Sequence, residues 1–495
     1  MAEVHDLLVI GGGINGAGIA RDAAGRGLKV LLVEQGDLAS ATSSASSKLA
    51  HGGLRYLETY EFRLVAEALA EREVLMAIAP HLCWPMTFVL PHDSALRPAW
   101  KIRLGLLLYD RLARRSRLPA SRAIAPARDL IDNPLAPRFG RAFTYADCWL
   151  DDARLVVLNA VDAVERGADI RTRCRVIGAR PAGDVWEVRL ATADSREHTA
   201  AARIIVNAAG PWADKVRASL DLEPAPPRLR LVRGSHIVVP RLHEGPEAFI
   251  LQNDDGRVVF LLPFEDDFTL IGTTDVEQAE PRAAAVSAKE IAYLCDAANR
   301  WLARPVTPAD VVWSYAGVRA LVDNRAADPA KVTREYSLDL EQHAHARLPV
   351  LSVYGGKLTT YRSLAETAVE KLRPLLSGLA PSWTARVPLP GGDLPDGGVT
   401  AFAAELQSRF AKLPAALVLR LVRTYGTRAE RIAAAAVGAS DAGMDIGSGI
   451  TRAELSYLVD TELARTAEDV LWRRGKLGLR VSPEERAGIE RALAR

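Results

Sequence analysis

Cysteine is scarce in this sequence. Its four cysteines, Cys83, Cys148, Cys174 and Cys295, lie far apart and form no CxxC pair. So few and such widely separated cysteines argue against a disulfide framework and against a zinc site. Both are therefore unexpected, no metal site is predicted, and the composition fits a reducing compartment.

Long apolar runs are also missing. No stretch of about 18 apolar residues occurs, so no transmembrane helix is expected. No signal peptide is apparent, because a structured motif begins within about ten residues of Met1.

A large net charge of either sign is absent as well. Lys and Arg total 63 against 61 Asp and Glu, which leaves a net charge of +2. No global field therefore draws the protein to nucleic acid. The 495 residues suggest about three domains, and 49% hydrophobic with 25% charged residues is an ordinary globular composition.

The first pattern that is present is a strand–turn–helix–strand unit over residues 5–34. Strands are predicted at 7–10 and 29–34, and a helix at 19–26. The turn between them holds the pattern GxGxxG at Gly11, Gly13 and Gly16, and the acid Glu34 ends the second strand.

Each part of this pattern has a physical role in binding a dinucleotide. Gly11 permits the tight turn, Gly13 lets the backbone approach a pyrophosphate, and Gly16 lets the helix pack on the strand. Glu34 would accept hydrogen bonds from the adenosine ribose. The alternative is a glycine-rich turn without a ligand. The spacing does not decide between NAD and FAD, but two further small-residue turns after strands, at 208–210 and 355–356, favour FAD.

The remaining chain shows further elements by periodicity. Helices are predicted at 62–79 and 361–373, and a change to an Ala, Leu, Arg and Glu-rich composition predicts a helical region from about residue 386. Strands are predicted at 203–207, 236–239, 249–251, 258–262, 268–271 and 350–356.

Two longer motifs carry a resemblance to a known family. Residues 10–27 and 355–365 resemble the two signatures of the FAD-dependent glycerol-3-phosphate dehydrogenases, within the wider glycine oxidase/D-amino-acid oxidase-like group. The stretches 40–58, 207–212 and 317–319 are also similar to the family pattern.

The resemblance implies an α/β fold with three parts. A Rossmann-type FAD-binding domain is discontinuous (1–80, 148–234 and 313–385). An inserted antiparallel-sheet domain (81–147 and 235–312) binds substrate and faces the membrane. An all-α C-terminal domain spans 386–495.

The resemblance also implies an activity, which is oxidation of sn-glycerol 3-phosphate to dihydroxyacetone phosphate. Hydride passes from C2 to flavin N5, and electrons pass on to a membrane quinone. Three alternatives stay open: a glycerol-3-phosphate oxidase that uses oxygen, a flavin enzyme for another 2-hydroxy acid or an amine, and a non-catalytic flavin-binding scaffold.

A phosphate dianion in a partly desolvated cleft requires cationic hydrogen-bond donors. By resemblance, the substrate pocket is lined by Arg55, Tyr56, Arg319, Arg334 and Lys357. For any one of these cations, the alternative is a solvated surface charge.

The reaction also needs a group that removes the C2 hydroxyl proton and a cation that stabilises the developing alkoxide. Arg319 is expected to supply the cation. Histidine is the usual base at neutral pH, and His51 and His236 are the candidates, although either could instead be a structural histidine.

Further FAD contacts are implied by the resemblance. They lie in the small-residue turns and in the Ser-rich stretch. They are Asn15, Thr42, Ser43, Ser47, Ala208, Gly210, Gly356 and Thr359.

Residues 97–118 carry seven Lys or Arg residues against one acid, Asp110, with apolar and aromatic residues interleaved. Beyond Pro98 this pattern predicts a basic amphipathic helix that lies on anionic lipid. The alternative is a buried helix with a solvated basic face. We expect a cytoplasmic protein held peripherally at the inner face of the cytoplasmic membrane. The sequence leaves the oligomeric state open, a homodimer included.

Overall fold

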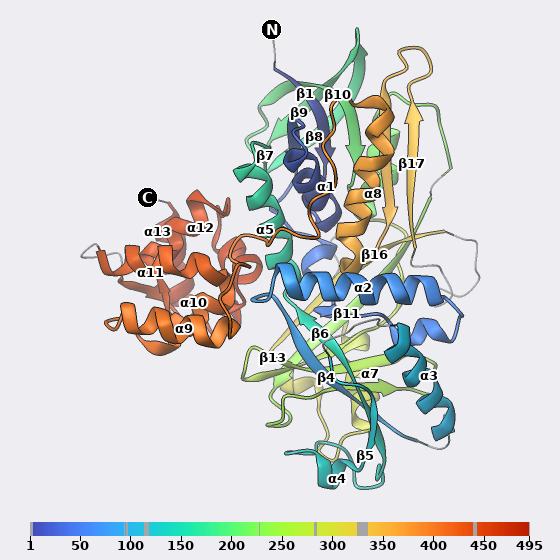
Figure 1. The fold of residues 1–495 in the computed structure, drawn as a ribbon, viewed down its shortest axis with the longest axis vertical. Coiled ribbons are helices and arrows are strands. Elements are labelled where there is room, and N and C mark those ends of the chain that lie inside the picture. The colour runs from blue at the N-terminus through green and yellow to red at the C-terminus, as the bar shows by residue number, and fades with distance from the viewer. Residues whose placement is uncertain are drawn as a thin grey trace.

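The computed structural model describes residues 3–93, 95, 98–112, 118–226, 228–281, 285–323, 335–438 and 443–494. Within these ranges the chain forms an eight-stranded sheet, a ten-stranded sheet and a helical C-terminal region. The C-terminal helices project from the side of the elongated body, next to α5 (Asp152–Glu165) (Figure 1).

The eight-stranded sheet is mostly parallel. Its central strands β18, β10, β1, β2 and β7 run parallel to one another, β17 pairs antiparallel at one edge, and β8 and β9 extend from β10. Its strands are β17 (Tyr336–Gln342), β18 (Pro349–Gly355), β10 (Glu197–Asn207), β1 (Val4–Ile10), β2 (Val30–Val33), β7 (Asp169–Arg171), β8 (Cys174–Ala182) and β9 (Val185–Thr192).

Both faces of this sheet are covered, which explains why β1 reads as a continuous apolar run. Leu7 and Val9 pack with α1 (Ile14–Gly25) and α8 (Tyr361–Leu372) in one core cluster. Leu8 and Ile10, which point the opposite way, pack with β8 and β9 in another. The sheet is therefore fixed from both sides around β1.

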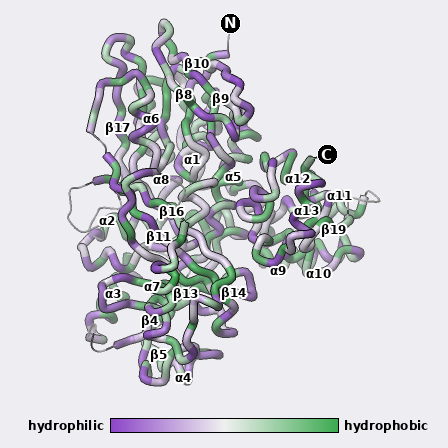
Figure 2. Tube along the Cα trace, turned by 180° about the vertical axis from the view of Figure 1, so that it is seen from behind, coloured by the Kyte–Doolittle hydropathy of each residue, from purple (hydrophilic) through white to green (hydrophobic). Residues whose placement is uncertain are grey.

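The second sheet is antiparallel except where β12 pairs with β4. Its centre is apolar, as the green colour of β13 and β14 shows (Figure 2). Its strands are β15 (Val276–Glu277), β11 (Leu229–Pro240), β16 (Trp313–Val322), β14 (Phe268–Gly272), β13 (Val258–Phe264), β12 (Ala248–Gln252), β4 (Cys83–Pro91), β6 (Ala142–Leu150), β5 (Arg122–Ile124) and β3 (Leu49–Ala50).

The C-terminal region has its own hydrophobic core. It also contains one short hairpin, so it is helical but not purely so. Its elements are α9 (Gly398–Arg409), α10 (Ala415–Tyr425), α11 (Ala429–Gly438), β19 (Asp445–Gly447), β20 (Ile450–Thr451), α12 (Arg452–Asp460), the π-helical η9 (Asp469–Arg474) and α13 (Pro483–Leu493).

Other helices lie over the second sheet and around its edges. They are η2 (Leu54–Leu57), α2 (Phe62–Ile78), α3 (Ala99–Leu112), α4 (Pro126–Asp129) and α7 (Ala288–Asn299). The short helix α6 (Ala213–Ala218) instead packs against β10 and β18 of the first sheet. Among the described helices, none combines the length and apolarity that crossing a bilayer needs.

The predicted fold class is confirmed: a Rossmann-type sheet, an antiparallel-sheet part and a helical C-terminal domain are all present. The first helix begins at Ile14 rather than Ile19. Gly16 lies in its first turn, and close packing there outweighs the low helix propensity of glycine. Strand β16 pairs in the second sheet, although 313–385 is predicted as part of the FAD-binding domain. The domain boundaries stay a prediction.

Candidate functional site

A cavity of about 1490 Å³ lies where the two sheets meet. The turns after β1, β2, β10 and β18 line one wall, and β11 and β16 line the opposite wall. Because neighbouring parallel strands end at the same edge of a sheet, turns that are far apart in sequence meet here.

The first glycine turn is closed by backbone contacts. Gly11 has φ +111°, and a Cβ atom there would lie 2.6 Å from the carbonyl oxygen of Ala208. A Cβ atom on Gly16 would lie 1.9 Å from the carbonyl oxygen of Gly11. Both predicted roles, the tight turn and the helix–strand packing, match this geometry.

Glu34 lies at the end of β2 and lines the cavity. Its carboxylate accepts hydrogen bonds from the N–H groups of Gly12 and Gly36, both at 2.7 Å. Burial raises its pKa even though these two donors favour the charged form. The acid is thus held in one orientation next to the N-terminus of α1.

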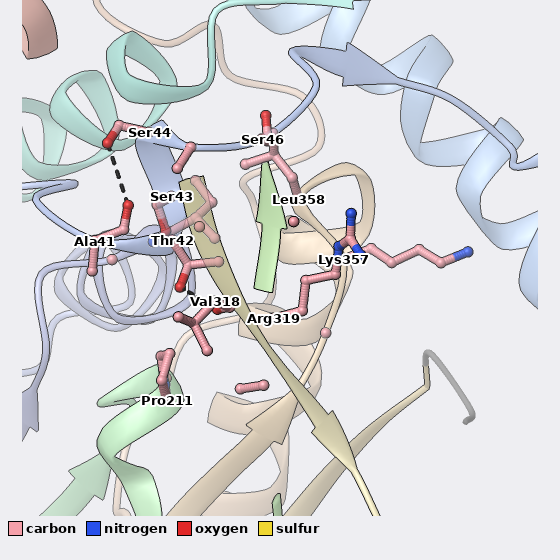
Figure 3. Close-up of a pocket in the computed structure, with 18 of the residues that line it drawn as sticks. Ala41, Thr42, Ser43, Ser44, Ser46, Pro211, Val318, Arg319, Lys357 and Leu358 are labelled. Atoms are coloured by element: carbon pink, nitrogen blue, oxygen red, sulfur yellow. Dashed lines mark hydrogen bonds between the residues drawn. The ribbon is translucent and has the colours of Figure 1, made fainter. Parts of the chain in front are cut away.

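The remaining predicted cofactor residues also line this wall, apart from Gly16 inside the turn. Ser43 Oγ accepts from the N–H of Ile14 at 3.0 Å, at the start of α1. Asn15 Nδ2 donates to the carbonyl of Gly355 at 3.2 Å, which joins the start of α1 to the turn after β18. Thr42 Oγ1 donates to the carbonyl of Val318 at 2.6 Å, which joins the loop after β2 to strand β16 (Figure 3).

These features form a cradle that fits FAD. Backbone without side chains faces the cavity at the glycine turns, the start of α1 supplies N–H donors, and Glu34 is placed for a ribose. Gly210 and Gly356, with φ of +53° and +96°, continue the bare backbone surface. We assign these residues to FAD as a prediction from geometry and sequence together.

Arg319 lies on the opposite wall, on β16. Strand alternation puts it on the same face as Trp313, Tyr315 and Gly317. Its guanidinium pairs with Asp275 and donates to Thr273 Oγ1 at 3.1 Å. Asp275 therefore fixes the guanidinium and offsets part of its charge.

Lys357, in the turn after β18, lines the same cavity as Arg319 (Figure 3). Its Nζ lies 3.9 Å from the centre of the Tyr56 ring. Arg55 and Tyr56, on η2, line the cavity as well. Three of the predicted cations thus converge on one cavity, while Arg334 lies outside the described residues.

The two candidate histidines differ in their surroundings. His236 is 2% exposed and stacks on Tyr315, with 4.7 Å between ring centres. Ser47 Oγ is 2.9 Å from His236 Nε2. Burial, followed by Arg319 and Lys48, holds the pKa of His236 well below its usual value, so the ring is neutral.

His51 lines the cavity and is only half-buried. Its backbone N–H lies 3.3 Å from Thr359 Oγ1, and its ring meets Phe260 edge-on at 6.4 Å. Both histidines therefore border the cavity, but His51 has the more open ring.

An ion pair missed by the sequence analysis lies behind the Ser-rich loop. Lys48 Nζ bonds to both carboxylate oxygens of Asp152 at 2.9 and 3.0 Å, and both side chains are buried. Although burial opposes the charge of Asp152, Lys48 and Lys476 hold its pKa below its usual range. Ser46 also donates to this carboxylate. No local motif marks the pair, because its residues are about 100 positions apart.

A second omission is the C-terminal region. Glu468, Trp472, Arg473 and Lys476 line the same cavity. Trp472 stacks on Trp313 with 4.2 Å between ring centres. Nothing near residue 472 has the form of a binding motif, so sequence reasoning had no signal for it.

Comparisons with known proteins agree with this geometry. Residues 6–362 match the family model described as FAD dependent oxidoreductase, and residues 382–493 match the C-terminal domain of alpha-glycerophosphate oxidase. A glycerol-3-phosphate dehydrogenase of Pseudomonas aeruginosa is 51% identical, over 99% of this chain and 95% of the relative. A D-erythritol 1-phosphate dehydrogenase of Brucella abortus is 48% identical, over 98% and 97%.

Solved structures extend the comparison. The glycerol-3-phosphate dehydrogenase from Bacillus halodurans, solved with FAD, aligns with a TM-score of 0.75 at 28% identity, over 97% of this chain and 87% of that chain. A glycine oxidase from Geobacillus kaustophilus aligns with a TM-score of 0.57 at 19% identity, over 78% and 98%. The second likeness shows a shared fold alone and agrees with the predicted fold group.

Proposed function

The chain belongs to the FAD-dependent oxidoreductases and, within them, to the glycerol-3-phosphate dehydrogenase family; from this premise we propose that it oxidises sn-glycerol 3-phosphate to dihydroxyacetone phosphate. FAD is its cofactor. The observation that carries the proposal is the convergence of Arg55, Arg319 and Lys357 on the cavity that fits FAD. A cavity of this charge suits a small phosphate ester.

The cations have different roles in binding such a substrate. Lys357 and Arg55 grip the phosphate, Lys357 as a point charge beside the Tyr56 ring. Arg319 lies on a rigid strand and is fixed by Asp275, so it donates to the oxygen on C2 and stabilises the charge that develops there. Bound FAD supplies the acceptor for the hydride that leaves C2.

We propose that His51 accepts the proton of the C2 hydroxyl. Its ring is half-buried and borders the cavity. The lowered pKa of His236 makes that ring a weak base at neutral pH, so it acts as a neutral hydrogen-bond partner of Ser47.

An anaerobic titration tests the reaction directly. Adding sn-glycerol 3-phosphate to the purified FAD-loaded protein without oxygen should bleach the visible absorbance of the oxidised flavin. A flavin that stays oxidised would overturn the proposed substrate. The enantiomer, sn-glycerol 1-phosphate, is the matched control.

A second substrate is favoured by a specific observation, the relative named D-erythritol 1-phosphate dehydrogenase at 48% identity. The same titration with D-erythritol 1-phosphate compares the two. A higher kcat/KM for the four-carbon ester would move the assignment to that substrate and leave the cofactor and cation roles intact.

The electron acceptor is proposed to be a membrane quinone. The C-terminal match to a domain of alpha-glycerophosphate oxidase makes oxygen the competing acceptor. Turnover with a soluble quinone analogue, compared with peroxide formed in air, separates the two. Peroxide at the full rate of turnover would identify an oxidase.

Peripheral membrane contact is proposed through α3. Its described part is a helix with four apolar side chains exposed: Trp100, Leu104, Leu107 and Leu108. Tyr60 and Phe62, which are also exposed, flank η2 and the start of α2, and α3 packs against both of these helices. Because η2 lines the cavity, this apolar surface adjoins the part of the cavity wall that a lipid-borne acceptor would approach.

A liposome pelleting assay tests the contact. Trp100→Ser with Leu104→Ser should reduce pelleting with all vesicles, and Lys101→Glu with Arg111→Glu only with anionic ones. Ile131→Ser, which removes an exposed apolar residue elsewhere, is the control. Unchanged pelleting of both double variants would refute the role of α3. The predicted cations Arg97, Arg114, Arg115 and Arg117 lie outside the described residues.

A further inference from the structure

The C-terminal region meets the FAD-binding sheet through a buried cluster of charges. Asp37, which follows β2, accepts from Arg473 Nε at 2.7 Å and from Arg474 Nη2 at 2.9 Å. Arg474 is fully buried, and Asp37 is nearly so. The two arginines belong to η9, the π-helical segment of the C-terminal region.

The segment η9 also binds the turn between β7 and β8, which contains Arg173. Asp469 accepts from Arg173 Nη2 at 2.6 Å and also pairs with Arg473. Although Asp469 is buried, backbone N–H groups and these arginines lower its pKa to about 2, so it stays charged. The backbone N–H of Arg173 donates to the carbonyl of Gly36 at 2.7 Å. Residues 36 and 37 are therefore clamped by groups fixed to η9.

The loop at residues 36 and 37 sets the orientation of Glu34. The N–H of Gly36 donates to Glu34 Oε1, and the N–H of Cys174 donates to the carbonyl of Glu34 at 2.8 Å. A displacement of Asp37 would therefore move the donor that aims the carboxylate at the cavity. π-Helical turns are rare and recur at functional sites, which agrees with η9 reaching the cavity wall.

We propose that Arg473 and Arg474 are positioning residues for FAD, because through Asp37 they hold the loop that orients Glu34. The bonds from η9 to Asp37 then contribute to the affinity for FAD. The C-terminal region is part of the cofactor site rather than a separate module on its surface. The proposal concerns cofactor affinity and does not depend on which polyol phosphate is oxidised.

The test is the dissociation constant of FAD, measured by titrating FAD into the deflavinated full-length protein. Asp37→Asn and Arg473→Gln should each raise Kd about tenfold, since each removes a charged hydrogen bond of the clamp. The double variant should bind no more weakly than the weaker single variant, because both changes break the same link. Arg473→Lys, which keeps the charge, should recover part of the affinity.

Glu462→Gln is the matched control. Glu462 forms a buried ion pair with Arg154 across the same boundary but does not line the cavity, and its carbonyl, which accepts from Arg474, is unchanged. It should lower the melting temperature and leave the Kd of FAD within twofold. An equal loss of FAD affinity in this control would overturn the proposal.

The proposal would also fail if Asp37→Asn and Arg473→Gln bind FAD within twofold of the parent protein. If Asp37→Asn does not fold, Arg473→Gln and Arg473→Lys decide alone. Arg473 is the less buried member of the pair of arginines, and Asp37 keeps its bonds to Arg474 in both variants.

Discussion

The two walls of the cavity reach their form by different means. The wall made by the turns after β1, β2, β10 and β18 consists largely of backbone: glycines, N–H groups and one fixed acid, Glu34. The opposite wall, on β11 and β16, consists of side chains such as Arg319 and His236, held by stacking and ion pairs.

The difference shows how each wall tolerates change. A backbone wall depends on the absence of side chains, so adding one methyl group is enough to break it. A side-chain wall depends on pairs of residues, so removing one partner leaves a buried charge or an unfilled contact. The following predictions separate these two kinds of failure.

The largest effect is expected on the backbone wall, for Gly16→Ala. The added Cβ would lie 1.9 Å from the carbonyl oxygen of Gly11, and neither backbone segment can move away. We expect roughly 100-fold weaker FAD binding or none, from overpacking of about 3 kcal/mol. Fluorescence titration of FAD measures it. Gly105→Ala, in α3 with open space around it, should leave binding unchanged.

Arg319→Ala should damage the side-chain wall without loss of the flavin. Removing the donor to the C2 oxygen is expected to lower kcat/KM by roughly 10² to 10³. Steady-state kinetics and the flavin absorbance are measured together. Arg230→Ala, on the adjacent strand and paired with Glu277, is the control. Full activity of Arg319→Ala would remove it from the site.

Lys48→Met tests the ion pair behind the Ser-rich loop. It leaves the carboxylate of Asp152 buried without its main partner, at a cost of about 3 kcal/mol in the free energy of unfolding. Denaturant unfolding measures the loss. Adding Asp152→Asn should recover part of it, and a double variant as unstable as the single one would contradict the pairing.

The smallest effect concerns pH. Burial keeps His236 neutral in the native protein, whereas the unfolded chain takes up a proton below about pH 6.5. Below that pH the unfolded state binds more protons than the native state, so the free energy of unfolding decreases by about 1.4 kcal/mol for each unit by which the pH is lowered. His236→Gln removes this titrating group, so the slope of the free energy of unfolding against pH should decrease by about 1.4 kcal/mol per unit between about pH 5 and pH 6. An unchanged slope would show that His236 is protonated in the native protein.

Much of the backbone wall could be predicted because its signals are local. The strand, the glycine turn and Glu34 lie within residues 5–34, and the geometry of one strand–turn–helix–strand unit fixes their spacing. The family signatures added Arg319 and Lys357 by position. The first helix begins five residues before its predicted start, because the low helix propensity of Gly16 is outweighed by close packing that the sequence does not reveal.

The rest needed the folded chain. Lys48 and Asp152, or Asp37 and Arg474, have no mark in sequence, since an ion pair between distant segments follows no spacing rule. The stacking of Trp472 on Trp313 likewise depends on how the C-terminal region docks.

The amino-acid order alone therefore determined the elements and the dinucleotide turn, because backbone conformation responds to neighbours a few residues away. Tertiary packing decided which distant charges are buried together, that His236 is buried and neutral, and what closes the cavity. Those properties depend on desolvation and on distances across the fold, which exist only once the sheets and the C-terminal helices have come together.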